Sequence, residues 1–263
     1  MTICVTDPWN LSRIMPAEGG AHVVVPSSAV VLAAGDPVPA ALLPDVADAI
    51  DAATLTVAAD GGIAHAHRAG HEVDVLVGDL DSVGARALAR AREAGTEVLT
   101  HPRDKAMTDL DLALTVVLDR LAVPPVDHER PRRPDVLVVG GHGGRLDHLI
   151  GNLLVLAADR YAPLRLRAWW GTDVVHLVRD EVTLTGSPGA TVTLLALHGA
   201  AEGVTTTGLR FPLDDAVLAP GSSLGVSNEL VAPTATVRVR RGVLAAIQTT
   251  EEPCAPASSP CSL

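Results

Sequence analysis

A short apolar run at residues 75–77 stops at Gly78 and is followed by two carboxylates, Asp79 and Asp81. β-Branched residues without polar alternation are typical of a strand that is buried on both faces of a parallel sheet. The carboxylates would then lie at the carboxyl edge of that sheet, where ligands bind and where paired aspartates hold hard cations such as Mg²⁺. The structural alternative is that Asp79 is a turn residue and Asp81 a helix N-cap.

Apolar runs and segments with helical spacing alternate through the first 160 residues. Segments with helical spacing at 42–53, 63–69, 83–94, 110–121 and 149–158 separate apolar runs at 29–34, 54–59, 96–99 and 135–139. Alternating strands and helices indicate an α/β domain with a mostly parallel sheet, which we place at residues 26–160. We expect Ser82 to cap the helix at 83–94, and Thr108 or Asp109 to cap the helix at 110–121.

The pattern changes near residue 164. Short alternating or β-branched runs follow at 172–178, 181–185, 190–197, 235–240 and 243–249, separated by Gly, Pro, Asn or Asp. Strands at this spacing predict an all-β sandwich, placed at residues 165–250. Residues 1–25 are expected to form an irregular lead-in, and residues 251–263, with three prolines and three serines, a disordered tail.

Composition excludes some classes of partner. A formal net charge of -11 argues against a general nucleic-acid binder, which needs a basic face. No run of 18 apolar residues and no N-terminal signal pattern is present, so no membrane partner is expected. Cys4, Cys254 and Cys261 are odd in number and favour a reducing cytoplasm over a disulfide framework, with a pair between the last two as the alternative.

Four aspartates follow predicted strands or lie just beyond them: Asp60, Asp79, Asp81 and Asp109. A parallel sheet brings such strand ends to one edge, where this many unpaired carboxylates would repel and shift one another's pKa. A divalent metal and a polyphosphate would resolve that repulsion. The pattern therefore indicates phosphoryl-type transfer, with one aspartate orienting or deprotonating an acceptor hydroxyl.

Two glycine-rich turns follow predicted strands. Gly61 and Gly62 would let backbone N–H groups approach an anion beside a helix N-terminus, although a Gly-Gly turn is more often just a tight turn. Residues 140–144 contain four glycines, which suggests close approach by another group, with a flexible loop as the alternative. Arg145, directly after them, offers a planar donor fork suited to phosphate.

Taken as a set, these stretches resemble the thiamine pyrophosphokinase (thiamine diphosphokinase) family. The matching pieces occur in family order between residues 54 and 248: ADGG at 59–62, GDLDS at 78–82, TD at 108–109, GGRLDH at 143–148 with Asn152, EGVTTTGL at 202–209 and SLGVSNE at 223–229. The resemblance implies an α/β domain followed by a β-sandwich, and a homodimer whose active sites are shared between subunits. It also implies transfer of the diphosphoryl group of ATP to the hydroxyl of thiamine, releasing AMP.

The resemblance further implies roles for individual residues. Asp79, Asp81 and Asp109 would hold Mg²⁺, with Asp60 near the metal and the acceptor. The nucleotide side would comprise Lys105, Arg145 and Asp147. His148 is left open between phosphate contact and packing.

On the thiamine side, the resemblance implies Thr206, Phe211, Ser227 and Asn228, supplied by the partner subunit. For Phe211 the alternative is a core aromatic residue. Ala106 stands where the family usually carries another Asp, and Asp104 is a possible substitute. Two alternatives remain: a hydroxymethylpterin diphosphokinase, and a nucleotide-binding regulatory protein without catalysis.

Overall fold

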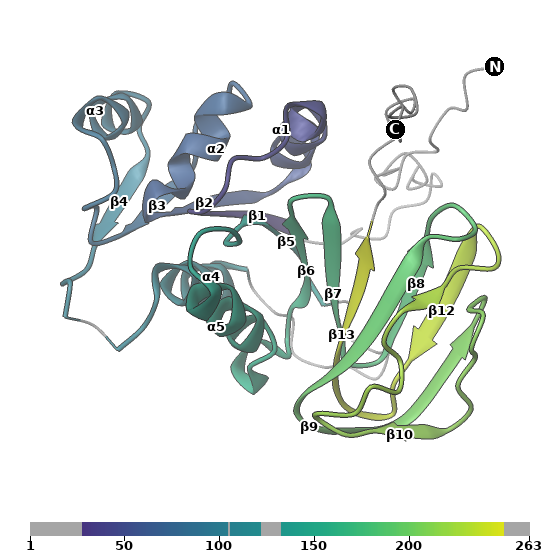
Figure 1. Cartoon of the computed structure of the whole chain (residues 1–263). Coiled ribbons are helices and arrows are strands. Elements are labelled where there is room, and N and C mark those ends of the chain that lie inside the picture. The colour runs from purple at the N-terminus through teal and green to yellow at the C-terminus, as the bar shows by residue number, and fades with distance from the viewer. Residues whose placement is uncertain (1–27, 105, 122–132, 250–263) are drawn as a thin grey trace, which may run out of the picture.

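One continuous β-sheet runs through the computed structural model, parallel in its first half and antiparallel in its second (Figure 1). The structure describes residues 28–104, 106–121 and 133–249. The predicted lead-in at 1–25 and the predicted tail at 251–263 lie outside these residues. None of the helices in the described ranges combines the length and the hydrophobicity needed to span a lipid bilayer.

The parallel half has the strand order β4-β3-β2-β1-β5-β6, and every neighbouring pair in it is parallel. Its strands are β1 (Ser28–Ala33), β2 (Leu55–Ala59), β3 (Val75–Gly78), β4 (Glu97–Thr100), β5 (Asp135–Gly140) and β6 (Arg165–Trp170). The chain leaves β1 towards β4 and then returns to the other side of β1 at β5. The strand order therefore reverses between β1 and β5, and such a reversal opens a crevice at the carboxyl ends of the strands.

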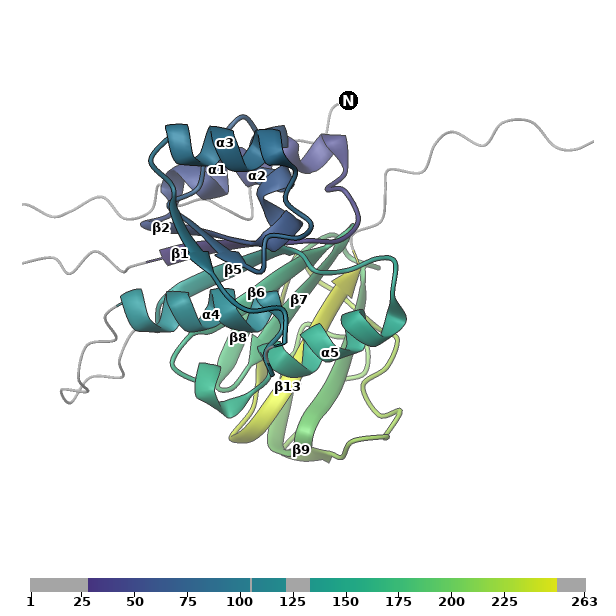
Figure 2. The same ribbon diagram turned by 90° about the vertical axis from the view of Figure 1, so that its left-hand side faces the viewer.

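Helices cover both faces of this half. In Figure 2, α1 (Leu43–Ala52), α2 (Ile63–Arg68) and α3 (Ala85–Glu93) lie above the sheet, whereas α4 (Asp109–Arg120) and α5 (Leu146–Leu156) lie below it. Successive strand residues point to opposite faces. In β1, Val31 and Ala33 accordingly belong to the core between the sheet and α4, while Val30 and Leu32 belong to the core between the sheet and helices α1 and α2.

The antiparallel half continues from β6 through β7, β13 and β9. Its strands are β7 (Asp173–Val178), β8 (Glu181–Thr185), β9 (Thr191–Thr207), β10 (Ala216–Leu218), β11 (Asn228–Glu229), β12 (Thr234–Arg238) and β13 (Arg241–Thr249). The long strand β9 pairs with β13 through its first part and with β10 and β12 through its last part. Strand β9 thereby links the two layers of a β-sandwich.

Strand β13 joins the two halves of the molecule. Val243 and Ala245 pack into the core shared with α4, whereas Leu244 and Ala246 pack into the sandwich core beside Val237 of β12. The fold class predicted from the sequence, an α/β unit followed by a β-rich one, is confirmed. The sheet itself crosses the predicted boundary at 160–165, because β6 pairs with β5 on one side and β7 on the other.

Strands β6, β10 and β11 and the second part of β9 were not predicted from the sequence. Two helix starts differ from the prediction. The helix expected at 83–94 begins at Ala85, with Gly84 rather than Ser82 at the N-cap position, and the helix expected at 149–158 begins earlier, at Leu146. Three 3-10 turns complete the described elements: Ala40–Leu42, Asp60–Gly62 and Asp159–Tyr161.

Candidate active site

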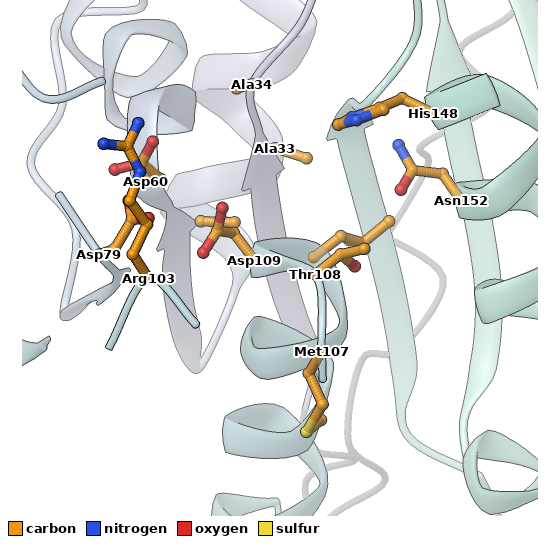
Figure 3. Close-up of a pocket in the computed structure, with 12 residues that line it drawn as sticks. Ala33, Ala34, Asp60, Asp79, Arg103, Met107, Thr108, Asp109, His148 and Asn152 are labelled. Atoms are coloured by element: carbon orange, nitrogen blue, oxygen red, sulfur yellow. The ribbon is translucent and has the colours of Figure 1, made fainter. Parts of the chain in front are cut away.

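The crevice between β1 and β5 holds a cavity of about 480 Å³ (Figure 3). The turns after the two strands are bound to each other: Asp36 N donates to His142 O at 2.9 Å, and Gly141 N donates to Ala34 O at 2.9 Å. The volume is in the range of small-molecule sites. The cavity is lined by Ala33, Ala34, Ala59, Asp60, Asp79, Arg103, Met107, Thr108, Asp109, Leu110, His148 and Asn152.

Three aspartates converge beside this cavity, at the ends of β2 and β3. Asp60, Asp79 and Asp81 each offer a carboxylate oxygen within 4.8 Å of the other two. The family resemblance implies Asp109 as the third metal ligand beside Asp79 and Asp81, whereas the structure brings Asp60 into this group instead. A separation of this kind suits one hard cation held by oxygen ligands.

Asp60 is held under electrostatic and conformational strain. It is 4% exposed and has a left-handed φ of 46°, which is unusual for a residue with a side chain. Burial raises the pKa of Asp60, the Ser82 hydroxyl and the Gly61 N–H oppose the shift, and the carboxylates of Asp109 and Asp79 add to it. Its buried Oδ1 has no hydrogen-bond partner among the described residues. A divalent cation would supply both the missing partner and the missing charge, so these residues fit Mg²⁺.

Local backbone structure explains Asp79 but not Asp81. Asp81 N donates to Asp79 Oδ1 at 3.2 Å, so Asp79 does act as a turn residue. Leu80 between them has a left-handed φ of 63°. The N-cap interpretation of Asp81 is wrong, because the helix begins four residues later at Ala85.

Asp109 is the first residue of α4 and belongs to the same acidic edge. The N-cap is Thr108, whose hydroxyl accepts from Asp111 N at 3.2 Å, so capping does not explain Asp109. Its carboxylate lies against the end of β3, since a Cβ built on Gly78 would be 3.1 Å from Asp109 Oδ1. Asp109 therefore adds negative charge next to the three convergent aspartates.

A cation that the sequence analysis missed lies over the acidic cluster. Arg103 lines the cavity and forms an ion pair with Asp81. Asp104, weighed as a substitute for the aspartate missing at Ala106, is exposed and does not line the cavity. Lys105, expected on the nucleotide side, lies outside the described residues.

The glycine-rich turns have packing reasons. A Cβ on Gly62 would lie 2.0 Å from Leu32 O, so Gly62 allows the turn after β2 to press against β1. Gly61 lies beside Ser82 and Ala34 in ordinary contact. The group that approaches the second turn is Asp36, whose carboxyl carbon lies 2.0 Å from where a Cβ on Gly143 would stand. Close packing of the crevice walls thus accounts for Gly62 and Gly143.

The start of α5 forms the opposite wall. His148 and Asn152 face the cavity across from the aspartates in Figure 3, and Asn152 Nδ2 donates to Gly141 O at 2.7 Å. Arg145 and Asp147 are exposed and form a two-point ion pair, with Arg145 Nε 3.1 Å from Asp147 Oδ1. This pair lowers the pKa of Asp147 and raises that of Arg145. Neither residue lines the cavity.

The four residues expected on the thiamine side lie in the antiparallel half, and none of them lines the acidic cavity. Thr206 is buried, and its hydroxyl accepts from Leu213 N at 2.9 Å. Phe211 is 61% exposed, so the alternative of a core aromatic residue is wrong. Ser227 has a left-handed φ of 57° and is exposed, whereas Asn228 is buried.

Comparison with known protein families gives two matches that follow one another along the chain. Residues 46–166 match the model described as "Thiamin pyrophosphokinase, catalytic domain". Residues 176–244 match "Thiamin pyrophosphokinase, vitamin B1 binding domain". The first match contains all four aspartates of the acidic edge, and the second contains Thr206, Phe211, Ser227 and Asn228.

Individual relatives agree with these matches. A thiamine pyrophosphokinase of Bacillus subtilis is 26% identical over 216 residues, covering 81% of this chain and 95% of that protein. Thiamine pyrophosphokinase 1 of Oryza sativa subsp. japonica is 27% identical over 209 residues, covering 72% of this chain and 76% of that protein.

Solved structures show the same fold. The crystal structure of the B. subtilis thiamine pyrophosphokinase superimposes with a TM-score of 0.69 at 24% identity, covering 86% of this chain and 100% of that chain. The yeast thiamin pyrophosphokinase gives a TM-score of 0.66 at 15% identity, covering 86% and 87%. With both family models matched in order over most of its length, the chain belongs to the thiamin pyrophosphokinase family.

Proposed function

We propose that this protein is a thiamine diphosphokinase in which Asp60, Asp79, Asp81 and Asp109 hold magnesium and in which two subunits share each active site. It transfers the diphosphoryl group of ATP to thiamine and releases AMP. The observation that carries the magnesium proposal is the convergence of Asp60, Asp79 and Asp81 within 4.8 Å at the edge of the crevice. The odd number of cysteines favours the cytoplasm as its location.

The reaction forms one bond and breaks one. The hydroxyl oxygen of thiamine attacks the β-phosphorus of ATP, and the bond from that phosphorus to the oxygen shared with the α-phosphate breaks, so AMP leaves. When bound, magnesium supplies positive charge that neutralises the oxygens of the transferred group. Asp60 lines the cavity beside Asp79 and would orient the thiamine hydroxyl and accept its proton as the new bond forms.

On the nucleotide side, the start of α5 would receive the phosphates. The N–H groups at a helix N-terminus favour anions, and His148 faces the cavity there. Arg145 would reach phosphate by exchanging its present partner Asp147 for it, since both side chains are exposed. Lys105 remains a proposed nucleotide contact on the resemblance alone.

The homodimer proposal rests on the separation, within one chain, between the acidic cavity and the residues expected to bind thiamine. Among the residues that the structure describes, those that line the acidic cavity all belong to the parallel half, whereas Phe211 and Ser227 lie in the antiparallel half and outside that lining. Phe211 keeps a large aromatic surface exposed, which a second copy of the chain would bring over the cavity. Such a surface suits thiamine, which is a cation with flat rings.

The acceptor distinguishes this proposal from hydroxymethylpterin diphosphorylation. The match to the vitamin B1 binding domain covers residues 176–244 and supports thiamine. The two acceptors are compared side by side at equal concentration with ATP and Mg²⁺, following AMP release. Thiamine should give the faster release, whereas faster release with the pterin would contradict the thiamine assignment and leave the diphosphotransferase chemistry intact. No AMP release with either acceptor would favour a non-catalytic nucleotide-binding protein.

A further inference from the structure

The carboxamide of Asn228 binds the backbone of Phe211 at both of its polar groups. Asn228 Oδ1 accepts from Phe211 N at 3.0 Å, and Asn228 Nδ2 donates to Phe211 O at 2.8 Å. The same Oδ1 also accepts from Glu229 N at 2.9 Å. A side-chain amide that pairs with both the N–H and the C=O of one residue fixes the position and the direction of that stretch of backbone.

Asn228 is itself held firmly. It is 3% exposed and belongs to β11, where it pairs with Val192 of β9. The neighbouring residues reinforce the contact, because Arg210 N donates to Glu229 O at 2.9 Å. The segment that carries Phe211 is therefore bound to β11, and β11 to the sandwich.

The ring of Phe211 contrasts with its backbone. The residue is 61% exposed, so its ring contributes little to the sandwich core. The Arg210 guanidinium lies 5.6 Å from the ring centroid, and Arg210 Nη1 is 3.0 Å from Glu229 Oε2. The Arg210 guanidinium, held in place by Glu229, thus covers part of the Phe211 ring. A firmly held backbone under an exposed ring is the arrangement of a binding surface rather than of a packing residue.

We propose that Asn228 is a positioning residue that acts through Phe211 and does not itself contact thiamine. This role differs from the direct contact that the family resemblance implies, because the carboxamide is buried and already bound to backbone groups. Fixing the ring before thiamine arrives lowers the ordering cost of binding. The inference rests on the proposed function, specifically on Phe211 as the surface against which thiamine stacks.

A double-mutant cycle tests the proposal. The Kd of thiamine is measured by calorimetry with Mg²⁺ and a non-hydrolysable ATP analogue for the native chain, Asn228→Ala, Phe211→Ala and the double variant. Asn228→Ala should raise the Kd about fivefold in the native background and less than about twofold in the Phe211→Ala background, since two residues that act through one contact are not additive. The KM for ATP should stay unchanged in all four.

Gln248 provides a matched control for loss of stability. It is a buried amide of the same sandwich, 5% exposed, and its Nε2 donates to Thr185 O at 2.8 Å. Gln248→Leu should lower the melting temperature as Asn228→Ala does, yet leave the thiamine Kd unchanged. Should Asn228→Ala not fold, Asn228→Asp replaces it, because the carboxylate keeps both acceptor contacts and loses only the donor to Phe211 O.

The outcomes separate this inference from the proposed function. Additive losses in the cycle, or a native Kd in a folded Asn228 variant, would overturn the positioning role alone. An unchanged Kd in Phe211→Ala would overturn Phe211 as the thiamine surface, and the positioning role with it. Loss of affinity in Asn228→Ala that disappears without the Phe211 ring would support both.

Discussion

Arg103 and Asp81 form an ion pair across the mouth of the acidic site, with Arg103 Nη2 2.5 Å from Asp81 Oδ2. Figure 3 places the Arg103 side chain beside Asp60 and Asp79. The arginine therefore supplies part of the positive charge that a bound cation would supply. A divalent metal that takes Asp81 as a ligand has to compete with Arg103.

Removal of this competitor should tighten metal binding. Exposed ion pairs contribute about 0.2–1 kcal/mol, so Arg103→Gln should lower the Kd of Mg²⁺ for the nucleotide-free protein by about 1.5- to fivefold. Calorimetric titration with Mg²⁺ measures this. Arg120→Gln breaks a similarly exposed pair with Glu97 elsewhere and should leave the Kd unchanged. Weaker Mg²⁺ binding in Arg103→Gln would show that the arginine supports the site instead of competing for it.

Asp79→Asn should abolish turnover and leave the fold intact. The substitution keeps the side-chain shape but removes one anionic ligand, which leaves the charge of the triphosphate and metal poorly compensated. We expect kcat to fall by at least about 100-fold, with a melting temperature within a few degrees of the native value. Asp119→Asn, on the exposed side of α4, is the control and should retain native activity. Near-native rates for Asp79→Asn at saturating Mg²⁺ would contradict the assignment.

Chains with complementary defects should rescue one another if active sites are shared. An Asp81→Asn chain lacks part of the acidic edge and a Phe211→Ala chain lacks the ring, but one site of the mixed dimer has both residues intact. Activity at limiting thiamine should therefore rise after subunit exchange. A mixture of Asp60→Asn and Asp81→Asn chains should gain nothing, because both residues belong to the same group of convergent aspartates on one chain. No recovery despite proven exchange would refute a site built from two subunits.

The acidic edge was predictable from the sequence because the signal for it is local. Strand ends at 59 and 78 follow from apolar runs that stop at Asp or Gly, and parallel strands bring such ends together. The local sequence does not show whether Asp60 or Asp109 converges with Asp79 and Asp81. Which of them converges depends on the left-handed turn at Asp60 and on where α4 begins, and both are set by packing between segments far apart in the sequence.

Strand β6 and the second part of β9 were missed for a similar reason. Residues 165–170 alternate arginine with apolar residues and act as a strand only because β5 and β7 lie on either side. Residues 199–207 contain Gly, Ala and Thr, which fit a strand when β10 and β12 pair with them. The Asn228 contact was likewise hidden, since its partner Phe211 lies 17 residues earlier.

Stability should fall on acidification through His176. This residue lies on β7 between β6 and β13, and burial, followed by the positive charge of Arg167, lowers its pKa from 6.5 to about 4. The unfolded chain then binds the proton first, so stability is full above pH 6.5 and is lost as the pH falls towards 4. The loss reaches about 3 kcal/mol.

His176→Gln should flatten this part of the stability profile, measured by urea unfolding at successive pH values. Burial also lowers the pKa of His65 and His142, so a smaller slope should remain. The exposed His198→Gln is the control and should keep the native slope. An unchanged slope in His176→Gln would rule out His176 as the source.

Analysis of the reaction products is the most direct test of diphosphoryl transfer from ATP to thiamine. The purified chain is incubated with ATP, Mg²⁺ and thiamine, and nucleotides and thiamine phosphates are separated and quantified over time. AMP and thiamine diphosphate should form in equal amounts, and neither should form without thiamine. Formation of ADP with thiamine monophosphate, or of AMP at the same rate without thiamine, would contradict diphosphoryl transfer to thiamine at this site.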